Sequence, residues 1–262
     1  MSAHYTENLN HLYPWATLDT FQTDTPQMNL DVIRNQVVTE FENTDTLLII
    51  NTSGNGGSHL LHALGNQLLK MKKNIYCISA PRLVQEYEKG NSWLLKDIMN
   101  SKYLLIDGFH HTSDLPRFRS WFQASLSRRT MEGKKAILSC AVDNMQDGFL
   151  PAFSAGLGRV EKAYATRPGN ECLEKIISRL FDQAGMLAGP AVIKALLGLG
   201  APSVGQLKVL AKFIIIQALE KKINLSKMTE RQFIFQFNKQ LKQFTSPRPD
   251  QSIGTTLSRR RG

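Results

Sequence analysis

The chain lacks the features that would mark a membrane or secreted protein. No apolar run in its 262 residues approaches the roughly eighteen needed to cross a membrane, and the N-terminus has no basic segment followed by an apolar one. Its three cysteines, Cys77, Cys140 and Cys172, form neither a CxxC pair nor a disulfide framework. We therefore expect a globular cytoplasmic protein with no membrane partner.

Acidic residues are too few to balance the basic ones. The 32 Lys and Arg against 22 Asp and Glu give a net charge of +10 and a pI near 9.6. This balance favours nucleic acid or an acidic protein as partner, although a solvated helix face explains any single basic group equally well. The excess collects around Arg128 to Lys135, along Lys208 to Lys242 and in the C-terminal tail. The nucleic-acid candidates are Lys221, Lys222, Arg259, Arg260 and Arg261.

The segment Leu47–Gln67, LLIINTSGNGGSHLLHALGNQ, has the layout of a phosphate-binding loop without its lysine. An apolar strand leads into a Gly/Ser/Asn turn, and a helix begins near Ser58. A phosphate loop needs glycines whose backbone N–H groups surround the phosphates, a lysine for the β and γ oxygens, and a hydroxyl for magnesium. Gly54, Gly56 and Ser58 are present, but Gly57 stands where the lysine belongs.

Apolar patterns predict alternating strands and helices in the first two thirds of the chain. The expected strands are 47–51, 74–79, 103–106, 135–140 and 160–165, and the expected helices are 29–42, 58–71, 81–89, 92–99 and 114–130. Repeated βα units predict a parallel sheet with helices on both faces, which binds ligands at the carboxyl ends of its strands.

From Pro168 onward the pattern is helical only. The expected helices are 171–184, 189–199, 203–220 and 229–244. The organisation that we predict is an N-terminal arm (1–20), an α/β base domain (21–167), a small helical lid domain (168–245) and a basic tail (246–262). The tail contains Pro, Gly and charge but no apolar stripe, so it is predicted to be disordered.

The run GGSHLLHALGN resembles the start of the first helix in the DnaA/Hda family of AAA+ proteins, where the loop ends GKT or GRS and HLLHA follows. The order of segments is similar as well. Residues 21–29 resemble the family's entry segment, YLLID (103–107) its Walker B strand, and AILSC (136–140) its sensor 1 strand. The resemblance implies an AAA+ (P-loop NTPase-like) base followed by a helical lid.

The resemblance also implies a nucleotide site, formed here by Gly54, Gly56, Gly57, Ser58 and Asp107. Several positions depart from the family: Gly108 replaces the second Walker B acid, Ala141 and Val142 replace the polar end of sensor 1, and Gly205 stands at sensor 2, one turn from Lys208. We therefore expect no ATPase activity and no catalytic residue. Two readings of the loop remain open: ADP or ATP binding without hydrolysis, or an inherited turn whose glycines only permit a tight backbone.

The histidines do not predict a metal site. His59 and His62 are accounted for by the resemblance and have no third ligand beside them, whereas His110 and His111 follow the Walker B strand with Asp114 nearby, which leaves a metal site there as the minor alternative. A loop with a satisfied histidine pair is the simpler interpretation.

Three residues are candidates for protein contacts. Arg159, in GLGRVEK, falls near the family's arginine-finger position, from which it would act on a partner's ATPase site. Leu12 and Tyr13, in ENLNHLYPW, stand where Hda-like proteins carry a sliding-clamp-binding peptide.

The sequence thus favours a catalytically inactive DnaA/Hda-like AAA+ adaptor that regulates replication initiation through protein contacts. Because few residues follow the lid, we expect no helix-turn-helix domain of the kind with which initiators read origin DNA. The expected partners are a DnaA-type ATPase or a sliding clamp, and homo- or hetero-oligomers would form through AAA+ surfaces. The alternative is a basic pseudo-ATPase that binds nucleic acid, for example a helicase-loader-like subunit of a replication assembly.

Overall fold

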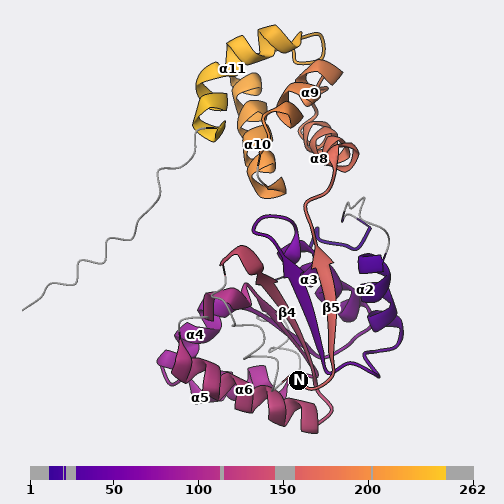
Figure 1. Cartoon of the computed structure of the whole chain (residues 1–262), viewed down its shortest axis with the longest axis vertical. Coiled ribbons are helices and arrows are strands. Elements are labelled where there is room, and N and C mark those ends of the chain that lie inside the picture. Colours follow the sequence, from indigo (N-terminus) through magenta and orange to yellow (C-terminus); the bar gives the residue numbers. More distant parts are fainter. Residues whose placement is uncertain are drawn as a thin grey trace, which may run out of the picture. The chain divides into compact units, whose positions relative to one another are not determined.

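The computed structural model describes residues 12–19, 21, 28–112, 115–144, 157–201 and 203–245 (Figure 1). The chain divides into two compact units. The first comprises Met1–Ile176 with Ser203–Gly205, and the second comprises the rest of the chain from Ile177. The division falls within helix α8 (Asn170–Gln183), whereas the sequence pattern had placed a boundary between residues 167 and 168.

A five-stranded parallel sheet forms the centre of the first unit. Its strands are β1 (Thr46–Asn51), β2 (Ile75–Ser79), β3 (Tyr103–Asp107), β4 (Lys135–Ala141) and β5 (Val160–Ala165). They follow the order β2-β3-β4-β1-β5, so β1 pairs with both β4 and β5. In this register Leu48 lies opposite Leu138 on one side and Lys162 on the other.

Strands β1 to β4 are buried on both faces because helices cover both faces of the sheet, whereas β5 at the edge also carries the exposed Lys162 (Figure 1). Leu48 and Ile50 of β1 point into a core with α4 (Ala80–Glu88), α5 (Ser92–Asn100) and α6 (Pro116–Met131). Leu47 and Ile49 point the other way, into a core with α2 (Met28–Val38) and α3 (Gly57–Lys70). The predicted α/β fold, with a parallel sheet between two helical layers, is confirmed.

Helix α2 ends earlier than the sequence pattern predicts. The expected helix ran to residue 42, but α2 ends at Val38. Glu40 and Phe41 have φ values of 48° and 61°, and the Phe41 N–H donates to the Gln36 carbonyl at 2.9 Å. This left-handed closure ends the helix and turns Phe41 fully into the core.

The described part of the N-terminal arm packs against α3. Leu12 and Ala16 are buried, and the Asn66 side-chain amide donates to the carbonyls of Tyr13 and Ala16 at 2.8 Å each. The segment 12–19 is therefore part of the first unit's packing, in contrast to the extended arm that the sequence suggested.

The second unit is helical, as predicted. Beyond the end of α8 it contains α9 (Pro190–Gly198), α10 (Val204–Glu220) and α11 (Glu230–Thr245). Its buried side chains include Phe181 of α8, Leu196 of α9, Ile214 of α10 and Phe233 of α11. No helix in the described ranges has both the length and the apolar character needed to cross a membrane.

Candidate nucleotide site

The predicted site lies where three neighbouring strands end. β1 ends at Asn51, β3 at Asp107 and β4 at Ala141, and β4 pairs with both of the other strands. Because the strands are parallel, their carboxyl ends meet at one edge of the sheet, which is where open α/β sheets bind ligands. The loop from Thr52 to Gly56 leads from β1 into α3 at this edge.

The loop keeps the backbone form of a phosphate cradle. Gly54 and Gly56 have φ values of 77° and 101°, in the left-handed region that favours glycine. Gly56 precedes the first residue of α3, and no side chain caps this helix. The backbone therefore offers an anion the N–H groups of a helix N-terminus.

The space that the missing lysine would need is taken by Asn51. In the pattern G-x-x-x-x-G-K-[ST] the first glycine falls at residue 51 and the lysine at residue 57. A Cβ atom added to Gly57 would lie 2.6 Å from Cγ of Asn51 and closer still to its Oδ1. Packed atoms do not approach so closely, so Asn51 would have to move before Gly57 could carry any side chain. Compared with the phosphate-loop motif, this chain therefore has a side chain at residue 51, where the motif has glycine, and none at residue 57, where the motif has lysine.

Asp107 accepts hydrogen bonds from two hydroxyl groups at the end of β3 and lies near His62. Ser58 Oγ donates to its Oδ1 at 2.9 Å, Ser139 Oγ donates to the same atom at 2.5 Å, and His62 Nε2 lies 3.7 Å from Oδ2. Burial alone would raise the pKa of Asp107, but these donors hold the pKa below its ordinary value. The carboxylate is therefore ionised at neutral pH. In phosphate-loop ATPases a hydroxyl and an aspartate of this kind hold magnesium.

The position after Asp107 does not accommodate a second carboxylate. Gly108 has a φ of 71°, and its N–H donates to Ser139 Oγ at 2.9 Å. A Cβ atom at this position would lie 3.0 Å from Cδ2 of His111. Backbone strain and steric crowding would therefore both oppose an acid at residue 108.

A carboxylate of the chain itself reaches the loop. Asp143, in the short helix η3 (Val142–Asn144), accepts the Ser53 N–H at 2.9 Å and the Ser53 hydroxyl at 3.2 Å. Its negative charge would repel a polyphosphate that approached the loop.

The histidines after β3 have a structural role. His110 Nδ1 accepts the N–H of Ala141 at 3.1 Å, at the end of the sensor 1-like strand. Burial and the neighbouring His111 lower the pKa of His110, so its imidazole is neutral at pH 7. Within the part of the chain that the structure describes, no three His, Cys, Asp or Glu residues are grouped so as to hold a metal ion.

Arg159 is tied within its own chain. It precedes β5, and its Nε lies 3.3 Å from Oδ2 of Asp45, while Nη2 donates to the Glu42 carbonyl at 3.1 Å. The Arg159 N–H also donates to Asp45, at 2.9 Å. The guanidinium that we expected to act on a partner thus braces the amino-terminal edge of the sheet, although 60% of the side chain is exposed.

Leu12 does not form a free clamp-binding peptide. It is 6% exposed and packs against Gly65, where a Cβ atom would lie 2.8 Å from Cδ2 of Leu12. Tyr13 remains 45% exposed and stacks on Trp15, with ring centroids 5.4 Å apart. The predicted partner contact of Leu12 would therefore require its side chain to leave the core of the first unit.

The basic residues near residue 130 are paired inside the chain. Arg128 and Lys134 both form ion pairs with Glu132, and Lys135 pairs with Asp45. The buried Arg129 donates to the carbonyls of Met99 and Lys135, at 2.6 and 2.8 Å. This group is therefore engaged in holding α5, α6 and β4 together.

The structure describes two of the five residues that the sequence suggests for nucleic-acid binding. Lys221 and Lys222 directly follow α10, and both are exposed. Arg259, Arg260 and Arg261 lie outside the described residues.

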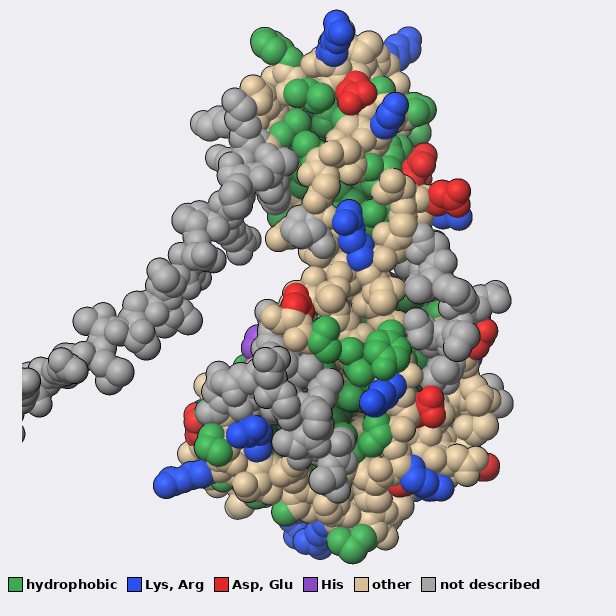
Figure 2. Space-filling model, viewed as in Figure 1, with side chains coloured by type: hydrophobic (Ala, Val, Ile, Leu, Met, Phe, Trp, Pro, Cys, Tyr) green, Lys and Arg blue, Asp and Glu red, His purple; other side chains and the backbone are tan. Residues whose placement is uncertain are grey.

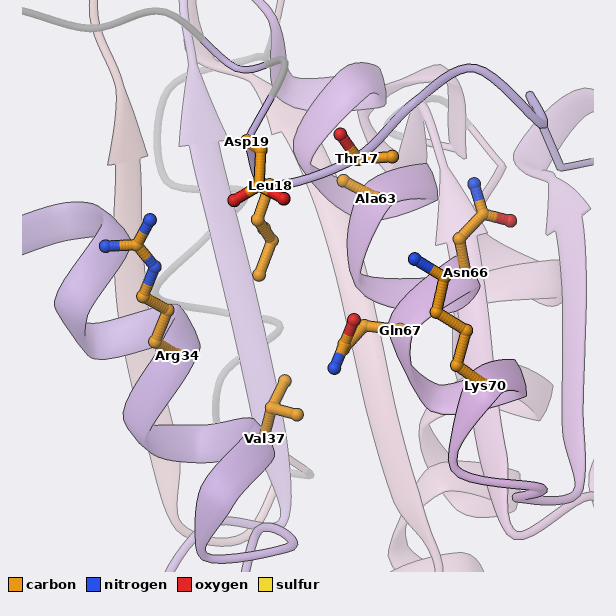
Figure 3. A pocket seen from close by; sticks show the side chains of 9 residues that line it. All are labelled: Thr17, Leu18, Asp19, Arg34, Val37, Ala63, Asn66, Gln67 and Lys70. Carbon is orange, nitrogen blue, oxygen red and sulfur yellow. The ribbon is translucent and has the colours of Figure 1, made fainter.

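A hollow of about 370 Å³ lies on the α2–α3 side of the sheet (Figure 3). Residues 17–19 of the arm line one side of it, Arg34 and Val37 come from α2, and Gln67 points into it from α3. None of the loop residues from Gly54 to Ser58 lines this hollow, so it is separate from the nucleotide site.

Two features of the site were missed in the sequence. Asn51 was detectable, because the loop motif requires a glycine at that position. Asp143 carried no such signal, because its contact with Ser53 joins residues 90 positions apart.

No protein-family model and no curated protein matches the chain. Several solved structures do. Domain III of the replication initiation protein DnaA from Thermotoga maritima aligns with a TM-score of 0.73 and 16% identity, over 90% of this chain and 99% of that one. A replication initiator DnaA bound to AMPPCP and single-stranded DNA aligns with a TM-score of 0.61 and 22% identity, over 80% and 69%.

The RuvB Holliday junction branch migration motor from Thermotoga maritima is also similar, with a TM-score of 0.62 and 14% identity over 86% of this chain and 72% of that one. At these identities the likeness establishes the fold, which is the AAA+ arrangement of an α/β base and a helical unit.

Proposed function

We propose that this protein is a DnaA/Hda-like AAA+ adaptor that does not hydrolyse ATP and that regulates replication initiation through protein contacts. The observation that carries the proposal is the position of the Asn51 side chain against Gly57, where the phosphate-loop motif has a glycine and a lysine, respectively. The fold supports a place among DnaA-like proteins, and the altered loop supports a role other than catalysis.

Hydrolysis of ATP in this class needs a cation on the phosphates, magnesium between a hydroxyl and an aspartate, and a group that positions water. Ser58 and Asp107 could still hold the metal. Without the lysine, a charge-assisted contact of roughly 1.5–3 kcal/mol is lost, which corresponds to about a ten- to hundredfold loss of affinity or more. With Gly108 in place of the second acid, the group that positions water is missing as well.

The proposed adaptor needs no cofactor. Retention of ADP or ATP without hydrolysis is the weaker option, because Asp143 lies against the same loop that would receive the phosphates.

Two assays on the purified chain test the proposal. The first measures phosphate release from ATP with magnesium, for the wild type and Asp107→Ala. The second adds the chain to a DnaA-type ATPase without DNA and follows complex formation and the partner's ATP hydrolysis.

We expect no turnover that depends on Asp107, together with a complex that changes the partner's hydrolysis rate. Turnover that Asp107→Ala abolishes would contradict the inactive site. A chain that forms no complex and leaves the partner's rate unchanged would contradict the adaptor role.

The second candidate function is nucleic-acid binding, which the net charge of +10 and the exposed Lys221 and Lys222 favour. Backbone contacts of this kind release counterions, so binding should weaken steeply with salt. Binding to DNA that falls when both lysines are changed to glutamine, or when residues 246–262 are removed, would support this function over the adaptor role.

A further inference from the structure

Helix α10 is apolar on two opposite faces. One face is buried in the second unit and includes Leu207, Leu210, Ile214 and Ala218. The opposite face carries an exposed apolar stripe, defined by Val209, Phe213, Ile216 and Leu219, which are 56%, 37%, 52% and 55% exposed. In a globular protein, an apolar face of a helix is normally covered by other protein.

The stripe is continuous along the helix. Its members are spaced by four, three and three residues, so they lie on one side of α10 over about 15 Å. In Figure 2, hydrophobic side chains of the second unit reach the surface between Lys and Arg side chains. A stripe of this length and spacing can pack against a second helix. Such a helix would contact the stripe through apolar residues at i, i+3, i+4 and i+7 of its own sequence.

Three cations gather beside the stripe. Lys208 and Lys212 are one turn apart on α10, and Arg179 of α8 lies near enough to act on Lys208. Partial burial, with the charges of Lys212 and Arg179, lowers the pKa of Lys208. None of the ion pairs found among the described residues involves these cations. A carboxylate from a partner could therefore pair with these cations and reduce their mutual repulsion.

The exposed apolar stripe and the neighbouring cations together favour one kind of binding partner. A nucleic-acid backbone would pair with the cations but would leave the apolar stripe exposed. In a symmetric dimer through the same surface, each cation cluster would face a cationic partner surface, which is unfavourable. A helix with apolar side chains along one face and carboxylates at its edge satisfies both features.

We propose that the exposed face of α10 binds an acidic amphipathic helix of another protein. Apolar side chains of that helix cover Val209, Phe213 and Ile216, and its carboxylates meet Lys208, Lys212 and Arg179. The inference rests on the proposed adaptor function, for which it supplies a docking surface and the chemistry of the partner.

The test uses two synthetic helical peptides and the full chain. Both peptides carry leucines at i, i+4, i+7 and i+11; one has glutamates beside the leucines and the other has lysines at the same positions. Binding of the fluorescein-labelled peptides is followed by anisotropy. We expect the acidic peptide to bind at least about tenfold more tightly than the basic one, because like charges across an interface oppose binding.

Variants of exposed residues locate the binding surface. Ile216→Glu should weaken binding of the acidic peptide about tenfold or more, and Lys212→Glu should weaken it as well. The matched controls are Leu187→Glu, in the exposed loop after α8, and Lys194→Glu, at an exposed position of α9. Both should bind as the wild type does. Circular dichroism verifies that each variant keeps its helical content, which glutamate at exposed helix positions favours.

Several outcomes would overturn the proposal. These are equal binding of the two peptides, no binding of either, or equal weakening by Ile216→Glu and Leu187→Glu. Sedimentation that shows a dimer lost in Ile216→Glu would assign the stripe to a second copy, and competition by an oligonucleotide would assign the cations to nucleic acid. Each of these would leave the adaptor function itself to be judged by complex formation with the DnaA-type ATPase.

Discussion

The side chain of Asn51 occupies the space into which a side chain at Gly57 would project. The Cγ atom of Asn51 lies 2.6 Å from the position that a Cβ atom on residue 57 would take, and the Asn51 amide donates to the Thr52 carbonyl at 2.9 Å. The loop therefore differs from a phosphate loop by a matched pair of changes. This coupling can be measured.

A double-mutant cycle should reveal the coupling between residues 51 and 57. Gly57→Ala alone should lower the free energy of unfolding by about 1 kcal/mol, because the Asn51 amide must turn away from the added methyl group and lose its hydrogen bond to the Thr52 carbonyl. The same change in an Asn51→Gly background should cost less, with an interaction energy of at least about 0.5 kcal/mol. Urea unfolding followed by tryptophan fluorescence measures this, since Trp15, Trp93 and Trp121 all lie in the first unit. Additive effects of the two changes would contradict the steric coupling.

A lysine at residue 57 should restore affinity for phosphate only when the Asn51 side chain is removed as well. We expect Asn51→Gly with Gly57→Lys to bind ATP about tenfold or more tightly than Gly57→Lys alone, because the lysine then reaches the phosphates. Calorimetric titration with magnesium-ATP compares the two variants. Asn51→Gly alone is the control and should bind no better than the wild type.

An acid introduced after Asp107 should destabilise the first unit. Gly108→Glu places a side chain at a φ of 71° and beside His111, so a loss of roughly 1–3 kcal/mol is expected. Gly90→Glu, at a φ of 66° but in open space, separates backbone strain from crowding. If Gly108→Glu unfolded at the wild-type urea concentration, the conformational reason for the missing acid would be wrong.

Leu12 should behave as a core residue. Leu12→Ala should lower the free energy of unfolding by about 2–5 kcal/mol, as for other buried leucines. Tyr13→Ala, at the exposed neighbouring position, should cost less. If Tyr13→Ala lowered the free energy of unfolding more than Leu12→Ala did, Leu12 would not be a core residue.

Asp45 should make the stability of the first unit depend on acid. Burial alone would raise the pKa of Asp45, but the hydrogen bonds and charge of Arg159, together with Lys135, hold the pKa below its ordinary value. The stabilisation is therefore fully present above the unfolded pKa of about 4 and is lost as the pH falls through the folded pKa. Between neutral pH and pH values below about 4, wild type should lose more free energy of unfolding than Asp45→Asn does. If the free energies of unfolding of wild type and Asp45→Asn fell in parallel with pH, this prediction would be wrong. The control is Asp31→Asn, because Asp31 forms an exposed ion pair with Arg34 at 3.8 Å.

The sequence predicts the sheet well because its signals are local. Apolar runs such as Leu47–Ile50 and Tyr103–Ile106 mark buried parallel strands, and helical spacing marks the layers that cover them. The end of α2 was missed because left-handed Glu40 and Phe41 carry no glycine signal. The intrachain contacts of Leu12 and Arg159 were also missed, because their partners Gly65 and Asp45 are distant in the chain.

Titration of the nucleotide-free full chain with ATP and ADP in magnesium decides whether this loop has lost productive nucleotide binding, as we propose. We expect no saturable binding tighter than that of Asp107→Ala, and no phosphate release above that variant. ADP that stays with the protein through purification, or magnesium-dependent turnover that Asp107→Ala removes, would contradict the proposal.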